Sequence, residues 1–295
     1  MTTAGSAGAD DRRATVCLTF DFDAISVWIG PHAARSPSMI SRGEYDVVGV
    51  ERILRLLDRE SIPATFFIPG HTVETFPDTV RAIIAAGHEV GHHGYLHENP
   101  VTLEPDEERR VLERGLAAFE QVVGLRPYGY RSPAWDNSPI TIDLLLEFGF
   151  QYESSLMGHD FRPYWCRSGD QLSLDGPYLF GHDVDLVELP VSWILDDHPH
   201  FEFYRSSRGR ADGLSAPSKV LEVWLGEFEF MYRDVPDGLY TLTMHPQVIG
   251  HGHRMLMLEQ LIAAIQSHEG VVFARTGDAA ARFRAQQTRN TSGHG

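Results

Sequence analysis

One stretch of the chain holds an unusual density of histidine. Residues 88–97 read His-Glu-Val-Gly-His-His-Gly-Tyr-Leu-His, so four of the chain's 15 histidines fall within ten positions. Imidazole is a common protein ligand of zinc, and the segment therefore predicts a metal site. Two pairs of histidines have a four-residue spacing that could serve one metal ion. The first pair is His88 and His92, and the second is His93 and His97.

The first pair belongs to the sequence His-Glu-x-x-His, which is the helical motif of zinc peptidases. That motif needs a continuous helix, whereas Gly87 and Gly91 lie beside and inside it and each costs about 1 kcal/mol relative to alanine. Residues 77–86 already form a complete expected helix that Gly87 ends, and residues 88–93 then read as a buried strand. This pattern favours the second pair of histidines, at the end of the strand. A zinc peptidase that uses the first pair remains the alternative.

A second group of candidate functional residues ends the first expected strand, residues 16–23. Its sequence begins with apolar residues and ends in Asp21 and Asp23, which share one face because side chains alternate along a strand. Two imidazoles and one carboxylate leave open positions on a bound metal, as a catalytic zinc site requires. Such a metal lowers the pKa of a water molecule and polarises a carbonyl group, which is the chemistry of hydrolysis.

These groups are placed by a chain that alternates between expected strands and helices. The strands cover residues 16–23, 64–69, 88–93, 128–133, 151–155, 187–193, 239–245 and 271–274. The helices cover residues 44–60, 77–86, 105–123, 140–148, 219–232, 254–267 and 277–284. The alternation predicts an α/β fold of parallel strands wrapped by helices, either a barrel or an open doubly wound sheet. Functional groups of a barrel collect at the carboxyl ends of its strands. In this chain those ends carry Asp21, Asp23, His93, Arg131, Asp196 or Asp197, and His245.

No linker divides the chain, so we expect one domain over residues 14–286. Residues 1–13 are rich in small and charged residues and are expected to form a disordered tail, as are residues 287–295. Residues 24–43 and 157–186 read as two long connections without clear periodicity. Both follow strands at the face that carries the candidate ligands, so we expect them to fold over the metal.

Charge and composition restrict the possible partners. The net charge of −16 disfavours nucleic acid, anionic membranes and polyanionic substrates. Cys17 and Cys166 provide neither a disulfide framework nor a thiolate metal site. Residues 1–15 lack the apolar core of a signal peptide, and no run of 18 apolar residues occurs. We therefore expect a cytoplasmic protein that binds neither nucleic acid nor membrane.

Four motifs in this order resemble those of the polysaccharide deacetylase family. They are Thr-Phe-Asp-Phe-Asp at 19–23, His-Gly-Tyr-Leu-His at 93–97, Tyr-Arg-Ser-Pro-Ala-Trp at 130–135 and Leu-Thr-Met-His at 242–245. The resemblance covers roughly residues 14–285 and implies a distorted (β/α) barrel, here of about seven parallel strands, with a divalent metal that is commonly zinc. The Asp-Phe-Asp spelling and the segments 157–165 and 187–199 are similar to a branch with cyclic imide hydrolases, allantoinase-like enzymes and intracellular peptidoglycan deacetylase homologues.

The resemblance implies a role for each matching residue. The metal ligands would be Asp23, His93 and His97, with Zn²⁺ as the ion and Co²⁺, Fe²⁺ or Mn²⁺ as alternatives. Asp21 would be the general base, kept ionised and oriented by Arg131. His245 would be the general acid that protonates the leaving nitrogen. Either Asp196 or Asp197 would keep this imidazole charged, and the sequence leaves open which one.

The substrate pocket is expected to be narrow, covered by loops and lined by aromatic residues. The candidates for substrate binding are Trp28, Trp135, Trp193, Arg162 and Tyr164. A closed, mostly apolar pocket suits a small molecule, whereas a glycan chain needs an open groove. We therefore expect a metal-dependent hydrolase of non-peptide C–N bonds that acts on a small cytosolic cyclic imide or amide. The alternatives are an N-deacetylase of glycan or peptidoglycan containing N-acetylglucosamine, and a non-haem iron oxygenase with a two-histidine, one-carboxylate triad. Similarity to this branch also suggests a homo-oligomer.

Overall fold

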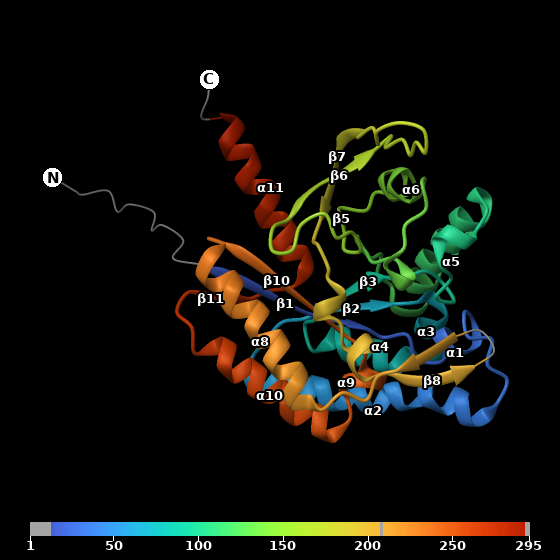
Figure 1. The fold of residues 1–295 in the computed structure, drawn as a ribbon. Helices are drawn as coiled ribbons and strands as arrows, with labels where there is room; N and C mark the ends of the chain where they lie inside the picture. Colours follow the sequence, from blue (N-terminus) through green and yellow to red (C-terminus); the bar gives the residue numbers. More distant parts are fainter. Residues whose placement is uncertain (1–12, 207–208, 293–295) are drawn as a thin grey trace.

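A curled sheet of nine strands forms the centre of the molecule, and helices cover its outer surface (Figure 1). The computed structural model describes residues 13–206 and 209–292. Neighbouring strands follow the order β10-β1-β2-β3-β4-β5-β7-β6, and β11 also pairs with β1. The strands are β1 (Ala14–Asp21), β2 (Thr65–Ile68), β3 (Glu89–His92), β4 (Gly129–Tyr130), β5 (Tyr152–Glu153), β6 (Tyr164–Ser168), β7 (His182–Glu188), β10 (Gly238–Met244) and β11 (Val271–Phe273).

Strand β1 lies inside this sheet and carries Asp21 at its end. All eight of its residues are buried, and it pairs in parallel with β10 along most of its length. On its other edge the first three residues pair with β11 and the last three pair with β2. A strand that is paired on both edges and covered on both faces needs a nearly continuous apolar sequence, which Val-Cys-Leu-Thr-Phe supplies.

The predicted α/β fold, a distorted (β/α) barrel, is confirmed as a curled, mostly parallel sheet that forms a half-barrel. Eight strands are parallel to their neighbours, against about seven predicted, and β6 is antiparallel to β7. The chain that follows β7 approaches β10 through a single bridge between Asp196 and Thr243. This bridge brings the candidate acids at 196 and 197 next to the strand that ends before His245.

Helices follow the strands and pack against the outer face of the sheet, with α8 and α10 side by side along one flank (Figure 1). Proline occupies the first turn of several of them, where its fixed φ suits a helix and its missing N–H is not needed. The helices are α1 (Ile25–Ile29), α2 (Pro37–Glu60), α3 (Gly70–Thr75), α4 (Pro77–Ala85), α5 (Pro105–Val123), α6 (Thr141–Glu147), α7 (Asp197–Phe201), α8 (Pro217–Asp234), α9 (Pro246–Ile249), α10 (Gly252–Gln266) and α11 (Thr276–Ser292). Short 3-10 turns cover η1 (Pro100–Thr102), η2 (Pro133–Trp135) and η3 (Trp193–Leu195).

The two long connections of the sequence analysis contain regular structure, so their description as loops is wrong. Within residues 24–43, α1 forms and α2 begins at Pro37 rather than at residue 44, since this polar first part of the helix lacks apolar periodicity. Within residues 157–186, β6 and the start of β7 form an antiparallel edge of the sheet. A separate hairpin, β8 (Phe203–Ser206) with β9 (Gly209–Asp212), was not predicted.

The ends of the chain differ in part from the predicted domain limits. Helix α11 continues to Ser292, beyond the predicted end of the domain at residue 286, so the predicted C-terminal tail begins too early. Residues 1–12 of the predicted N-terminal tail and residues 293–295 of the predicted C-terminal tail lie outside the described residues. Arg13 is described, and its amide donates to the carbonyl of Gly270 at 2.8 Å. Among the described helices, none combines the length and the hydropathy that a membrane span requires.

Candidate active site

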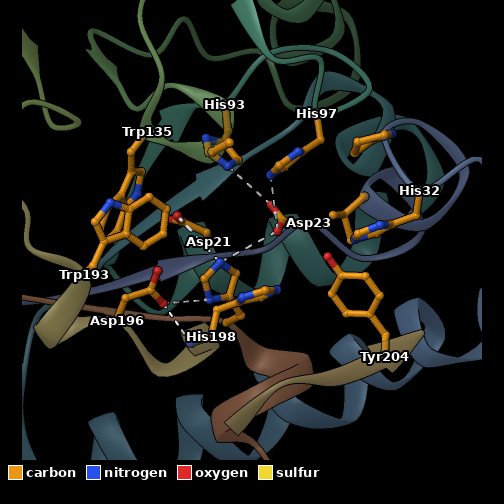
Figure 2. A pocket seen from close by; sticks show the side chains of 14 residues that line it. Asp21, Asp23, His32, His93, His97, Trp135, Trp193, Asp196, His198 and Tyr204 are labelled. Carbon is orange, nitrogen blue, oxygen red and sulfur yellow. Dashed lines mark hydrogen bonds and ion pairs between the residues drawn. The ribbon is translucent and has the colours of Figure 1, made fainter. Parts of the chain in front are cut away.

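The candidate catalytic residues converge at the carboxyl ends of four strands. Figure 2 shows Asp21, Asp23 and His93 facing one another. Asp21 ends β1 and Asp23 comes two residues later, while His93 follows β3. Arg131 follows β4, and His245 follows β10. Because parallel strands all point their carboxyl ends to the same side, residues more than 200 positions apart in the sequence meet here. The structure therefore brings together the catalytic and metal-binding candidates of the sequence analysis.

Asp23, His93 and His97 form a candidate metal centre. Nε2 of His93 lies 3.4 Å from Oδ1 of Asp23, and Nε2 of His97 lies 3.7 Å from Oδ2. Ligands held at 2.0–2.2 Å around one tetrahedral ion are about 3.3–3.6 Å apart, so these two separations are close to the spacing of ligands around one ion. Oδ1 of Asp23 is buried without a hydrogen-bond partner, which is costly unless a cation binds it.

The hydrogen bond on the far side of the His93 ring prepares it as a ligand. Nδ1 lies 2.8 Å from the main-chain carbonyl oxygen of Arg131. A carbonyl can only accept, so Nδ1 carries the proton and Nε2 keeps a free lone pair that faces Asp23. Burial lowers the pKa of His93 to about 4, and burial also holds the pKa of His97 well below its usual value. Both rings are therefore neutral near pH 7, the state that binds metal.

A tight loop after β3 returns His97 to the side of His93. Gly94 has φ 71° and His97 has φ 58°, so the backbone is left-handed at both positions. The side chain of Glu98 accepts hydrogen bonds from two amides of this loop, at 3.1 and 2.7 Å. The two imidazole rings then lie with their centroids 5.0 Å apart. A tight loop, rather than one turn of a helix, thus brings the two histidines of this four-residue spacing together.

The zinc-peptidase alternative is wrong because its histidines lie on and beside a strand and have other partners. His92 is fully buried, with Nε2 3.2 Å from the carbonyl of Leu112 and Nδ1 3.2 Å from the amide of Gly94. Nδ1 of His88 accepts a hydrogen bond from the amide of Ala64 at 3.2 Å. Neither histidine belongs to a group of potential metal ligands among the described residues.

Asp21, the candidate base, is paired with Arg131. The guanidinium Nη1 donates to Oδ1 of Asp21 at 2.8 Å, and both side chains are buried. Arg131 also donates to Thr19 at 2.9 Å and to the carbonyl of Ser154 at 3.0 Å, which fixes its orientation. Burial alone would raise the pKa of Asp21, but the Arg131 charge and the neighbouring imidazoles hold it below its usual value. The predicted pairing of these two residues is present in the structure.

His245 is held by Asp197, and this answers the question that the sequence left open. Nδ1 of His245 lies 2.7 Å from Oδ1 of Asp197, whereas the nearest oxygen of Asp196 is 3.6 Å away. The opposite nitrogen, Nε2, lies 4.0 Å from Asp21 and 3.9 Å from Asp23. Burial would lower the pKa of His245, but the carboxylates, Asp197 foremost, raise it well above its usual value. The ring is therefore protonated near pH 7 and presents an N–H to the centre of the site.

Asp196 has a different place from its neighbour. Its Oδ1 accepts a hydrogen bond from the amide of His198 at 2.8 Å and so caps the start of α7. Its side chain also lines the cavity, and burial raises its pKa to about 7. Asp196 is thus positioned to contact a bound molecule rather than to orient the imidazole.

A cavity of about 210 Å³ lies directly over these groups. One wall consists of Trp135 and Trp193, whose rings are tilted by 34° with centroids 4.4 Å apart; Figure 2 shows the two side chains next to each other. The opposite wall consists of His32 and Tyr204, with ring centroids 4.4 Å apart, together with His198. The cavity is completed by Asp21, Asp23, Val27, Pro31, His93, His97, Ala134, Asp196 and His245.

The second aromatic wall is not predicted from the sequence. His198 lies inside the segment 187–199 that is part of the family resemblance. Its position directly after Asp196 and Asp197 could have predicted that it lies at the site. His32 lies within residues 24–43, for which the sequence predicts a long connection, and no motif marks it. Tyr204 comes from the β8–β9 hairpin, whose alternation is too short to identify from the sequence.

Three of the predicted pocket residues do not line the cavity, whereas Trp135 and Trp193 do. Trp28 is buried behind the His32 wall, and its indole N–H donates to Gln247 at 2.8 Å. Tyr164 is the first residue of β6, and Arg162 lies just before that strand. The hydroxyl of Tyr164 accepts a hydrogen bond from the amide of Gly158 at 3.0 Å. Their prediction as pocket residues is wrong because residues 157–186 build an edge of the sheet instead of a cover over the metal site.

Comparison with known proteins places the chain in a family. The polysaccharide deacetylase family model matches residues 9–153. A peptidoglycan deacetylase of Helicobacter pylori is 38% identical over 286 residues, which are 93% of this chain and 97% of that protein. The chain belongs to the polysaccharide deacetylase family. It is therefore a hydrolase that acts on carbon–nitrogen bonds.

Further relatives of this polysaccharide deacetylase family member support the assignment. A peptidoglycan deacetylase-like protein, FGM2 of Gibberella zeae, is 32% identical and covers 82% of this chain and 78% of its own. The crystal structure of a Mycobacterium smegmatis polysaccharide deacetylase superimposes with a TM-score of 0.84 at 37% identity, over 97% of this chain and 96% of that one. The Puue allantoinase structure shares the fold, with a TM-score of 0.75 at 23% identity over 93% and 91% of the two chains.

Proposed function

We propose that this protein is a metal-dependent hydrolase that opens a small cyclic imide or cleaves a small amide. The observation that carries this proposal is the cavity of about 210 Å³, which touches the candidate base, ligands and acid at once. Pockets for drug-sized ligands measure roughly 300–1,000 Å³, so this cavity suits a smaller molecule. Two facing aromatic walls suit a planar ring between them.

Asp23, His93 and His97 would hold one divalent ion, and their two imidazoles and one carboxylate suit Zn²⁺. When bound, the ion supplies a Lewis acid that polarises the scissile carbonyl and lowers the pKa of the attacking water. The same ligand types serve non-haem iron oxygenases. Hydrolysis is the better supported chemistry, because the chain is a hydrolase of the polysaccharide deacetylase family and the site also holds a candidate base and a candidate acid beside the ligands.

Asp21 would take the proton from the attacking water. The charge of the adjacent Arg131 keeps the carboxylate of Asp21 ionised. Arg131 donates its hydrogen bond to Oδ1, so Oδ2 is available to accept the proton. Arg131 is fully buried and is fixed by Ser154 and Thr19, so Asp21 cannot turn away from the site. A base held in one orientation lowers the cost of reaching the reactive geometry.

His245 would deliver a proton to the leaving nitrogen, which cannot depart as an amide anion. Its Nε2–H faces the ligand Asp23 and the base Asp21, at 3.9 and 4.0 Å, so the proton donor lies close to both. Asp197 holds Nδ1–H and stabilises the positive ring before the transfer. In a cyclic imide the protonated nitrogen stays attached to the opened chain as a primary amide, and the attacked carbonyl becomes a carboxylate.

A second candidate function is N-deacetylation of an acetamido sugar in glycan or peptidoglycan. It is favoured by the H. pylori relative, which is a peptidoglycan deacetylase and matches this chain over nearly its full length. The same base and acid would release acetate and a free amine. The location in the cytoplasm and the homo-oligomeric state expected from the sequence stay predictions.

The two functions are separated by a hydrolysis assay on protein loaded with zinc, cobalt or iron. The substrates are succinimide, hydantoin, dihydrouracil and N-acetylglucosamine oligomers of one to five sugars. Ring opening is measured as a loss of ultraviolet absorbance. Deacetylation is measured as the release of acetate. The proposal predicts turnover of at least one cyclic compound. Acetate release that rises with chain length, with no ring opening, would instead establish the glycan deacetylase.

A further inference from the structure

A buried carboxyl on α2 lies directly behind the candidate active site. Oδ2 of Asp46 accepts a hydrogen bond from the amide of Ala24 at 2.6 Å, and Ala24 is the residue after Asp23. The backbone amide of Gln247, two residues after His245, interacts with the same carboxyl. Asp46 has no exposed surface, and its Oδ1 has no partner that meets hydrogen-bond geometry. One side chain thus touches the two chain segments that leave the metal ligand and the candidate acid.

The backbone at Ala24 needs such support. Its angles of φ 50° and ψ −132° lie in a region that residues other than glycine rarely adopt. The bend is also held from its other side, because the carbonyl of Asp23 accepts hydrogen bonds from Ser26 at 3.0 Å and from the Thr72 hydroxyl at 2.7 Å. The direction of the Asp23 side chain therefore depends on contacts made by the following residue.

Helix α2 approaches both segments through its backbone on either side of Asp46. Gly43 and Gly49 lie three residues before and after it, on the same face of the helix. A Cβ atom at Gly43 would lie 2.5 Å from the carbonyl oxygen of Ala24, and a Cβ at Gly49 would overlap the carbonyl of Pro246. These contacts leave no room for a side chain, so α2 fixes how far apart the two segments lie.

We propose that Asp46 is a positioning residue that aligns the metal ligand Asp23 with the proton donor His245. These two groups follow strands β1 and β10, and their nearest oxygen and nitrogen atoms are 3.9 Å apart. Asp46 acts on both through main-chain amides and does not touch the substrate cavity. The inference rests on the proposed function, because it assigns Asp46 a part in the same metal-dependent reaction.

Another buried carboxyl offers a matched control. Glu89 begins β3 at the opposite end of the sheet, and it accepts hydrogen bonds from Thr65, Tyr152 and Gly277 at 2.8–3.0 Å. Glu89→Gln changes a buried carboxyl without touching the segments after Asp23 and His245. It should therefore lower stability without changing the metal centre.

The test measures Co²⁺ binding and the visible absorption spectrum of the bound ion. Asp46→Ala should weaken Co²⁺ binding roughly 10- to 100-fold and change the spectrum, as loss of outer-shell support does at other metal sites. Asp46→Asn keeps an acceptor oxygen for Ala24 and should restore most of both properties. For succinimide or chitotetraose, whichever is hydrolysed, the alanine variant should lose about tenfold in kcat with KM unchanged. Glu89→Gln should match the wild type in all of these measurements.

Two results would overturn the assignment of Asp46. One is a wild-type Co²⁺ affinity and spectrum in Asp46→Ala, and the other is equal damage in the alanine and asparagine variants. If the alanine variant does not fold, Gly43→Ala takes its place, because its Cβ presses on Ala24, and a wild-type Co²⁺ affinity there would also overturn it. The variant His93→Ala tests the proposed metal centre separately from the role of Asp46. Wild-type Co²⁺ binding in that variant would remove the proposed metal centre itself, whatever Asp46 does.

Discussion

Nδ1 of His245 donates a hydrogen bond to Asp197 at 2.7 Å, and this contact decides the state of the ring. Asp197 also accepts from the backbone amide of His245, at 3.0 and 3.1 Å, so the carboxylate is held from both sides. Asp197 has no exposed surface, which strengthens its attraction for a protonated imidazole. The neighbouring Asp196 instead caps α7 and lines the cavity.

The first prediction concerns the pH dependence of kcat/KM. His245 acts while protonated, and its raised pKa extends the protonated state to higher pH. Asp197→Asn removes the main cause of that rise, so the alkaline limb should move down by roughly 1–3 pH units. Asp196→Asn is the matched control and should move it much less. An alkaline limb that moves equally in both variants would show that the 2.7 Å contact does not set the pKa of His245.

The second prediction concerns the proton donor itself. His245→Ala should lower kcat about 10²- to 10⁴-fold on poor leaving groups and remove the alkaline limb. The loss should shrink on anilides with electron-withdrawing substituents, because their nitrogen needs less protonation as it leaves. Steady-state rates on a graded series of acetanilides measure this. A loss of constant size along the series would assign proton donation to another group.

The third prediction separates the base from the metal ligands. Asp21→Asn should lower kcat about 10²- to 10⁴-fold, because its amide cannot accept the proton of the attacking water. Metal content, measured by plasma mass spectrometry after dialysis, should stay near one ion per chain. In contrast, His93→Ala should lose most of the metal. If Asp21→Asn loses metal as fully as His93→Ala, then Asp21 is a ligand and the base must be sought elsewhere.

The sequence predicted the parts of the site that follow buried strands. Strand β1 is marked by a continuous apolar run, and its period places Asp21 and Asp23 on one face. The glycines around His92 disfavour a helix, and this pattern favours His93 and His97, whose role as metal ligands stays a prediction. Arg131 and His245 were found because they also follow strands. In each case a local pattern is enough, since parallel strands bring their ends to one place whatever the length of the connections.

Other parts of the site depend on contacts that local patterns do not encode. Asp196 and Asp197 are adjacent, and the one that faces His245 depends on how the segment after β7 pairs with the end of β10, through the bridge between Asp196 and Thr243. Tyr204 reaches the cavity through a short hairpin, so its position follows from tertiary packing. The sequence predicts Trp28 in the pocket, but its indole N–H donates a hydrogen bond to Gln247 and its side chain is buried in the core behind His32. Propensity and periodicity carry no information on such long-range pairs.

The fourth prediction concerns the aromatic wall of the cavity. Trp193 is 46% exposed and contacts the ring of Trp135 at the cavity, so Trp193→Ala should preserve the fold and the metal. Loss of one ring should raise KM for a cyclic substrate roughly 2- to 10-fold with little change in kcat. Phe180→Ala is the control, because Phe180 is 71% exposed and lies outside the cavity. Equal KM values in the two variants would mean that the substrate does not bind against the tryptophans.

The central claim is that Asp23, His93 and His97 bind the catalytic metal. The most direct measurement is an anomalous difference map from crystals grown with Zn²⁺, recorded on both sides of the zinc absorption edge. We predict one strong peak about 2.0–2.2 Å from Nε2 of His93, Nε2 of His97 and the carboxylate of Asp23. A peak on His88 and His92, or occupied zinc sites elsewhere with none among these three residues, would contradict the account.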